Sequence, residues 1–243
     1  MLREWWGALA DLFFPPKPFC PLCGGAGGPG GFCDACRSFL EKASLQPFCP
    51  VCGRFFAAEK SGFSGGPCRD CRLGARSFGA VRAAGPYEGA LKEAVLKFKY
   101  GGERHLAAGL AGLMARAARG LPLENIDRVV PVPMAAGRLR QRGYNQAELL
   151  AREVAGLLGL AVDGRALVKV RETPAQAGLN REERLANLAG AFWAREGRVR
   201  GRGILLVDDV VTTGSTMTAA AGALAGAGAA GVWGLAAASA RVF

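Results

Sequence analysis

The segment that most constrains the fold is residues 204–216, ILLVDDVVTTGST. Its first four residues form an apolar run without alternation, which is typical of a parallel strand buried on both faces. We expect this strand to stop at Asp208 and Asp209, which places both acids at its carboxyl end, where open α/β sheets bind their ligands. The segment therefore predicts an α/β fold built on a parallel sheet, with a ligand site at the end of this strand.

The acids and the turn after them have the composition of a sugar-phosphate site. Adjacent carboxylates bind vicinal hydroxyls or a hydrated magnesium ion, and an uncompensated pair serves a purely structural role poorly. The turn offers backbone amides and hydroxyls ahead of a helix predicted over 218–227, so a phosphate fits there; an ordinary capped helix is the alternative. A Walker loop is excluded because no Gly-Lys-Ser/Thr follows. The turn residues are Thr212, Thr213, Gly214, Ser215 and Thr216.

VDDVVTTGST, residues 207–216, resembles the phosphoribosyl pyrophosphate loop of type I phosphoribosyltransferases. The resemblance implies that Asp208 and Asp209 are the catalytic acids and hold the ribose hydroxyls. It also implies that residues 212–216 bind the 5-phosphate and that Mg²⁺ accompanies the pyrophosphate.

Eight cysteines, all in Cys-x-x-Cys pairs, organise the amino-terminal part of the chain. PFCPLCG from Pro18 recurs as PFCPVCG from Pro47, which indicates duplication of one unit. Four thiolates close a tetrahedral zinc site, so we predict two structural zinc ions; redox pairs or disulfides are disfavoured because neither a helix at these pairs nor secretion is expected. Pairing neighbours in sequence, with an interleaved arrangement left open, gives one site of Cys20, Cys23, Cys33 and Cys36 and another of Cys49, Cys52, Cys68 and Cys71.

A basic segment, GRLRQRGYNQAE from Gly137, follows a second buried strand predicted over 127–132. We expect its arginines in a turn ahead of a helix over 145–158, where guanidinium groups suit phosphate or pyrophosphate and Tyr144 is placed to stack on a base. A solvated basic loop explains the composition equally well. The arginines are Arg138, Arg140 and Arg142.

Residues 165–187 form another polar, basic stretch, too irregular for a core. We interpret it as a mobile hood over a phosphorylated ligand or as one wall of a nucleic-acid groove, with a solvated loop as the plainer alternative. A hairpin is expected after Phe192 and Trp193, before the central strand. The basic residues of the hood are Lys169, Arg171, Arg181 and Arg184.

The remaining segments predict packing elements. Strands are expected over 80–84 and 232–238, and helices over 87–99 and 103–118. The apolar face of the first helix is predicted to carry Leu91, Val95, Leu96 and Phe98, and its lysines, Lys99 among them, are expected in solvent. His105, the only histidine, is interpreted as incidental.

The formal net charge of the 243 residues is +11. Eight zinc-bound thiolates lower this charge but leave it positive, which favours polyanionic partners, although a solvated basic surface is the plainer explanation. No stretch approaches the roughly 18 apolar residues of a membrane span. Residues 1–17 predict an amphipathic helix that packs on the next domain, with docking on a membrane surface or on a partner as the minority interpretation. Glu4 and Asp11 interrupt its apolar run, which excludes a signal peptide and predicts a cytoplasmic location.

The order of motifs resembles the ComF family of competence-associated proteins across nearly the whole chain. The cysteine pairs are followed by YEGALKEAVLKFKY, VVPVPM, RQRGYNQAELLA, TPAQAGLNREERLANLAGAF and LLVDDVVTTGSTM. Eight cysteines exceed the four of a single ribbon. The resemblance implies a double zinc ribbon over 18–73 and a domain of the type I phosphoribosyltransferase fold over 78–243. Matches to an R-x-R-G-x-N-Q signature are Arg140, Arg142, Gly143, Asn145 and Gln146.

This resemblance implies a role in handling incoming single-stranded DNA during natural transformation, with a competence helicase or other DNA-uptake proteins as partners. Phosphoribosyl pyrophosphate or a nucleotide is the expected small ligand, and the Arg-rich segment with Asn145 and Gln146 is expected to bind pyrophosphate or DNA phosphate. Whether the site is an active enzyme is left open. A phosphoribosyltransferase of nucleotide salvage without a DNA role is the alternative.

Overall fold

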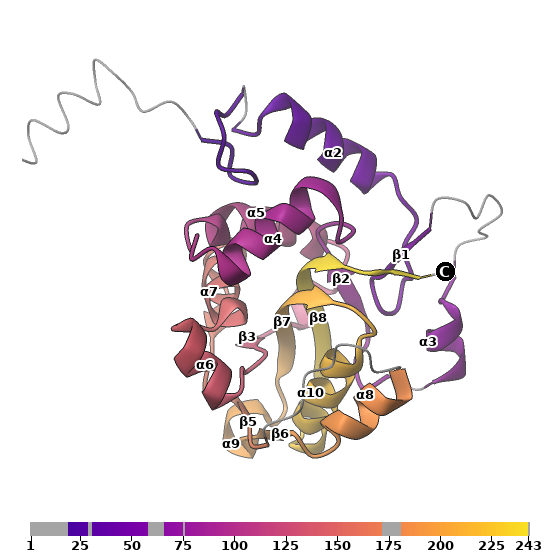
Figure 1. Cartoon of the computed structure of the whole chain (residues 1–243). Helices are drawn as coiled ribbons and strands as arrows, with labels where there is room; N and C mark the ends of the chain where they lie inside the picture. The colour runs from indigo at the N-terminus through magenta and orange to yellow at the C-terminus, as the bar shows by residue number, and fades with distance from the viewer. Residues whose placement is uncertain (1–18, 29–30, 58–65, 75, 172–180, 243) are drawn as a thin grey trace, which may run out of the picture.

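A five-stranded sheet lies at the centre of the computed structural model, which describes residues 19–28, 31–57, 66–74, 76–171 and 181–242 (Figure 1). All neighbouring strands of the sheet run parallel, which confirms the predicted α/β fold. The helix predicted over residues 1–17 lies outside the described residues. In spatial order the strands are β2 (Val81–Ala83), β8 (Gly231–Ser239), β7 (Gly203–Val211), β3 (Arg128–Pro131) and β4 (Ala161–Val162).

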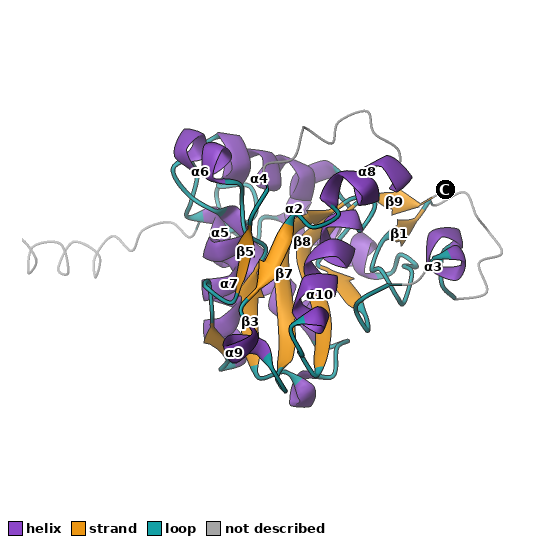
Figure 2. Cartoon of the chain, turned by 90° about the horizontal axis from the view of Figure 1, so that it is seen from below, coloured by secondary structure: helices purple, strands orange, loops and turns teal. Residues whose placement is uncertain are grey.

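Helices cover both faces of this sheet (Figure 2). Leu205 and Val207 of β7 belong to one core cluster, and Ile204 and Leu206 belong to the other. Because both faces are buried, the strand needs no polar side, which explains its unbroken apolar run. Within the described ranges, every helix falls short of the length and apolarity that a bilayer span requires. The first face carries α4 (Gly89–Tyr100), α5 (Leu106–Ala118) and α7 (Gln146–Leu158), the second carries α10 (Ser215–Gly226), and η1 (Leu123–Asn125) leads into β3.

Two boundaries of the central segment differ from the prediction. β7 does not stop at the two acids but continues to Val211, because β8 lies alongside and pairs Asp208 with Ala236 and Val211 with Ser239. The following helix begins at Ser215 and not at 218, because Gly214 takes the left-handed conformation (φ +78°) and turns the chain sharply. The loop between strand and helix is therefore only residues 212–214.

The basic segments are more regular than predicted. The arginines expected in a turn lie on a short helix, α6 (Ala136–Arg142), which Gly143 ends in the left-handed conformation. The hood contains β5 (Leu167–Lys169) and α8 (Arg181–Leu188), because the buried side chains of Leu167 and Leu188 anchor it on the core. Its residues 172–180 lie outside the described ones. Instead of the predicted hairpin, β6 (Phe192–Ala194) pairs antiparallel with β5 and is followed by α9 (Glu196–Val199).

Each cysteine unit contains a helix that begins directly after a cysteine. α2 (Asp34–Ser44) follows Cys33, and α3 (Arg69–Leu73) follows Cys68. The expectation that helices are absent from the cysteine pairs is therefore wrong for the second pair of each unit. A redox role does not follow from these helices, because each pair lies beside two further cysteines.

The two cysteine units pack against different faces of the sheet (Figure 1). Cys20 and Leu22 join the core cluster under α5, whereas Cys49 and Cys52 join the cluster under α10. The second unit is also hydrogen-bonded to the sheet domain, since the Ser239 hydroxyl donates to the Gly53 carbonyl (2.9 Å). Its strand β1 (Phe55–Phe56) pairs in parallel with β9 (Arg241–Val242) at the end of the chain.

Gly109 is the point at which the first unit meets α5. A Cβ added there would lie 2.0 Å from the carbonyl oxygen of Pro21, so backbone would have to move. We expect Gly109→Ala to lower the free energy of unfolding by about 1 to 3 kcal/mol, measured by urea denaturation. Gly112→Ala on the same helix meets nothing within 4 Å and is expected to stabilise by up to about 1 kcal/mol. Equal effects of the two changes would contradict this contact.

Candidate functional site

The acid pair at the end of β7 faces a lysine from α4. The Lys99 ammonium lies 2.9 Å from a carboxylate oxygen of Asp209, and both side chains are less than one-fifth exposed. The backbone N–H of Asp209 donates to the Asp208 carboxylate (2.8 Å). The predicted exposure of the helix lysines is therefore wrong for Lys99. Leu96, predicted on the apolar face of this helix, is 37% exposed.

Burial and the adjacent charge of Asp209 raise the pKa of Asp208 to about 7. Burial opposes the charged form of Lys99, but attraction to Asp209 and Asp208 outweighs it and raises the pKa of the lysine. Asp208 thus holds a proton near neutral pH, beside the Lys99–Asp209 ion pair. A ligand that donates hydrogen bonds from hydroxyls, or that brings a cation, stabilises the charged form of such a carboxylate pair.

A cavity of about 250 Å³ joins these acids to the basic segment. It brings together side chains that the sequence separates widely, including two that were placed in solvent or in the hood, Lys99 and Lys169. Arg140 is exposed and does not line this cavity. The polar lining consists of Asp208, Asp209, Thr216, Arg138, Arg142, Asn145, Gln146, Lys99 and Lys169.

Among the described residues, Gln146 is a buried amide without a partner that lines this cavity. Its side chain is buried, with 1% exposed, and neither its amide oxygen nor its amide nitrogen has a hydrogen-bond partner in the described part of the chain. A buried amide left unpaired costs about 1 to 3 kcal/mol per group. A polar ligand in the cavity relieves this cost.

Asn145 has a positioning role. Its side-chain oxygen accepts from the Ala147 N–H (3.1 Å) and caps α7, and its amide nitrogen donates to the Val132 carbonyl (3.1 Å). These bonds join the start of α7 to the segment that follows β3. Asn145 thereby fixes the neighbouring Gln146 at the edge of the cavity.

The loop of residues 212–214 has a conformation suited to an anion. Gly214 turns the chain so that the amino terminus of α10, where anions bind favourably, follows directly. The hydroxyls of Thr213 and Ser215 lie 2.8 Å apart, and Thr216 reaches the cavity. The predicted loop thus lies beside the acid pair, at the carboxyl end of β7.

Arg76, which the sequence did not single out, lies against this loop. Its Nη1 donates to the Thr218 hydroxyl (3.2 Å) and is 3.4 Å from where a Cβ on Gly214 would be. Its Nε and Nη2 are buried without a hydrogen-bond partner in the described residues. A lone arginine at a predicted domain junction gives no pattern by which the sequence reveals this contact.

Tyr144 does not line the cavity into which a base was expected to stack. Its hydroxyl donates to the Phe98 carbonyl, and its ring packs between Phe98 and the guanidinium of Arg104. The aromatic residues that do line the cavity are Tyr100 and Phe192. The Arg142 guanidinium lies 4.8 Å from the Tyr100 ring centroid.

The eight cysteines form two tetrads in sequence order, and in each the four sulfur atoms lie within 4.8 Å of one another. The predicted pairing is confirmed, and an interleaved one is excluded. The Cys23 and Cys33 sulfurs are 3.8 Å apart, and the Cys52 and Cys68 sulfurs are 3.7 Å apart. Both values are close to the sulfur–sulfur distance of about 3.8 Å expected when four thiolates bind one zinc ion tetrahedrally. The two tetrads suit two structural zinc ions.

Arg54 distinguishes the second tetrad from the first. Its buried guanidinium donates to the sulfurs of Cys52 (3.4 Å) and Cys68 (3.5 Å) and to Asp70 (2.6 Å). Four thiolates around Zn²⁺ leave a net negative charge, which this arginine offsets. Gly25 occupies the equivalent position of the first unit, a difference that alignment of the two repeats makes visible.

Comparisons with known proteins agree with both parts of this architecture. Residues 9–72 match the double zinc ribbon domain, and residues 140–240 match the phosphoribosyl transferase domain. The chain is 38% identical over 157 residues to DNA utilization protein YhgH of Salmonella typhi, which covers 62% of this chain and 68% of the relative. It is 31% identical over 156 residues to competence protein F of Haemophilus influenzae (62% and 68%) and 32% identical over 152 residues to competence protein ComFC of Streptococcus pneumoniae (62% and 64%).

Proposed function

Because this chain belongs to the ComF family, we propose that it handles incoming single-stranded DNA in natural transformation and binds phosphoribosyl pyrophosphate with Mg²⁺ at its acid pair. The observation that carries the ligand site is the cavity in which Asp208 and Asp209 meet Arg138, Arg142 and the unpaired amide of Gln146. The proposed partners in the cytoplasm are a competence helicase or other DNA-uptake proteins.

In this proposal each group of side chains binds a different part of the ligand. Asp208 and Asp209 accept hydrogen bonds from the ribose hydroxyls, and the amides and hydroxyls of residues 212–216 bind the 5-phosphate. Arg138 and Arg142 neutralise the pyrophosphate, and Gln146 supplies both a donor and an acceptor. Mg²⁺, when bound with the pyrophosphate, adds charge neutralisation.

A phosphoribosyltransferase of nucleotide salvage is the second candidate. The acid pair, the loop and the basic side chains around one cavity favour it, because phosphoribosyl transfer needs positioning and charge stabilisation more than a protein base. In that case Asp208 and Asp209 have a catalytic role, and the protein has no role in DNA handling.

Two titrations with the zinc-loaded protein test these functions. Calorimetry with Mg²⁺ and phosphoribosyl pyrophosphate measures the small-molecule site, and fluorescence anisotropy with a labelled oligothymidine measures single-stranded DNA binding. We expect saturable binding in both. Binding of phosphoribosyl pyrophosphate with turnover of a free base, but without DNA binding, would replace the proposal by nucleotide salvage. If the protein bound neither phosphoribosyl pyrophosphate nor DNA, both functions would be overturned.

The arginines of α6 offer a matched test of the pyrophosphate contact. We expect Arg138→Ala and Arg142→Ala each to raise the Kd for Mg-phosphoribosyl pyrophosphate by about tenfold or more, as loss of a charge-assisted hydrogen bond predicts. Arg140→Ala removes the same charge from the same helix outside the cavity and is expected to change this Kd less than threefold, in keeping with an exposed charge worth about 0 to 1 kcal/mol. An equal loss in all three variants would show that α6 acts only through net charge.

A further inference from the structure

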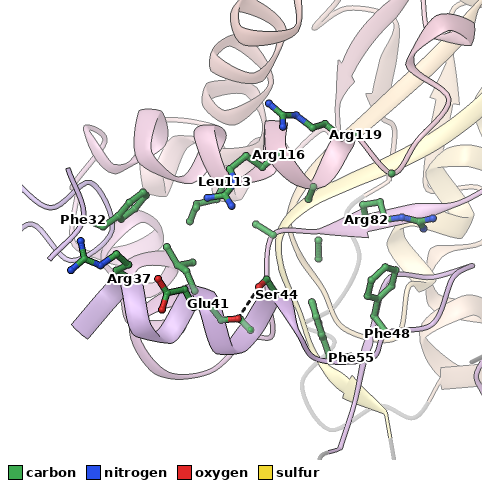
Figure 3. Close-up of a pocket in the computed structure, with 16 residues that line it drawn as sticks. Phe32, Arg37, Glu41, Ser44, Phe48, Phe55, Arg82, Leu113, Arg116 and Arg119 are labelled. Carbon is green, nitrogen blue, oxygen red and sulfur yellow. Dashed lines mark hydrogen bonds between the residues drawn. The ribbon is translucent and has the colours of Figure 1, made fainter. Parts of the chain in front are cut away.

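A second cavity, of about 640 Å³, lies between the cysteine units and the sheet domain (Figure 3). α2 forms one wall, and α5 with β2 forms the other. We call it the seam groove. It shares no lining residue with the cavity beside Asp208 and Asp209, so it is a separate site.

The charges that line the seam groove are predominantly positive. Arg37, Arg82, Arg116 and Arg119 line it together with a single acid, Glu41 (Figure 3). Arg116 and Arg119 are exposed and lie three residues apart at the end of α5. Among the residues that the structure describes, Arg82, Arg116 and Arg119 have no carboxylate within ion-pair distance. Positive charges without a carboxylate partner attract an anionic partner to the groove.

Aromatic rings lie beside these arginines. The Phe48 ring is 40% exposed, and the Arg82 guanidinium lies 5.3 Å from its centroid. Phe55 lies behind Phe48, with ring centroids 5.9 Å apart, and Phe32 lines the groove at α2. Arg82 is held in place because it donates to the carbonyls of Pro50 (2.8 Å) and Val81 (2.9 Å).

We propose that the seam groove binds single-stranded DNA, with bases stacked on Phe48 and phosphates bound by Arg82, Arg116 and Arg119. The choice of DNA rests on the proposed function; the location rests on the combination of rings and unmatched arginines, by which proteins bind single strands without sequence preference. Phe48 belongs to the second cysteine unit and the three arginines to the sheet domain, so a strand bound in this way contacts both. DNA binding therefore depends on the second cysteine unit being docked on the sheet domain.

Anisotropy of a labelled oligothymidine at several salt concentrations tests this site in the full-length, zinc-loaded protein. We expect the Arg116→Ala, Arg119→Ala double variant to bind at least tenfold more weakly at low salt. The slope of log K against log salt should fall by about 1.4, because two phosphate contacts are lost. Phe48→Ala should weaken binding by about fivefold or more through lost base stacking.

The control is the Arg195→Ala, Arg202→Ala double variant, which removes two exposed positive charges that line neither cavity. It should keep the affinity and most of the salt slope. All variants should bind Mg-phosphoribosyl pyrophosphate as the unsubstituted protein does, because the cavities share no residues.

The outcomes separate this proposal from the proposed function. If the unsubstituted protein binds DNA and the Arg116, Arg119 variant binds it equally well, the seam groove is overturned while the DNA role stands. If the groove variant and the control lose affinity equally, the groove is also overturned, because net charge alone explains binding. If the zinc-loaded protein binds no DNA, the DNA role fails and the groove proposal fails with it.

Discussion

Replacing both Asp208 and Asp209 with asparagine is expected to raise the Kd for Mg-phosphoribosyl pyrophosphate by at least about 100-fold. Each carboxylate is expected to accept a charge-assisted hydrogen bond, and such bonds are worth about 1.5 to 3 kcal/mol each. Calorimetric titration of both proteins at pH 8 measures the change, because the pKa of Asp208 is about 7 and this acid is then mostly ionised. Unchanged affinity in the variant would contradict the assignment of these acids.

Urea denaturation of the variants shows whether they fold, and the pH dependence of their stability tests the raised pKa of Asp208 independently. The pKa of Asp208 is raised on folding, so its protonated form stabilises the protein most at low pH, and this contribution is lost as the pH rises from about 4 through 7. Asp208→Asn lacks this loss. In urea denaturation the stability of the variant relative to the unsubstituted protein should therefore increase over that range and level off above it. A difference that is constant with pH would show that Asp208 titrates normally.

Replacing Cys52 with serine is expected to remove one of two zinc ions and to lower the free energy of unfolding by about 3 to 5 kcal/mol. Breaking a buried ion pair by removing one partner costs about this much, and here the guanidinium of Arg54 loses the sulfur of Cys52 and keeps the carboxylate of Asp70. Zinc content by mass spectrometry and urea denaturation measure the two effects.

Cys23→Ser is the matched control, because Cys23 occupies the equivalent position of the first repeat. Cys23 is only partly buried, and Gly25 stands where the second unit has Arg54. We expect this variant to lose one zinc ion with a smaller loss of stability. Equal losses would show that Arg54 has no special effect. A fully stable Cys52→Ser variant with two zinc ions would contradict the structural role of this tetrad.

Local patterns predicted most of the fold. The apolar run of β7 needed only its own sequence to be placed inside a parallel sheet, and the repeated Cys-x-x-Cys pairs predicted two tetrads in the observed order. Errors appeared where an element depends on its neighbour. β7 extends past its acids because β8 pairs with it, and β5 forms because β6 lies beside it.

The site was predicted only in part, because some of its residues are brought together by neighbouring elements. The acids and the loop are adjacent in sequence, so their chemistry is visible in one motif. Lys99 lies far from them along the chain and has the spacing of a surface lysine, and only the approach of α4 to β7 makes it the partner of Asp209. Arg76 is likewise placed at Thr218 by the path of the chain between the domains.

The sequence by itself determined the parallel sheet, the two cysteine tetrads, the acid pair and the loop that follows it, because each depends on residue types at short, regular spacing. Tertiary structure alone decided which basic side chains surround the acids, which arginine supports the second tetrad's thiolates, and that a basic, aromatic groove lies between the domains. These features depend on distances between segments remote in the sequence, and such distances are set by how the helices and cysteine units pack on the sheet.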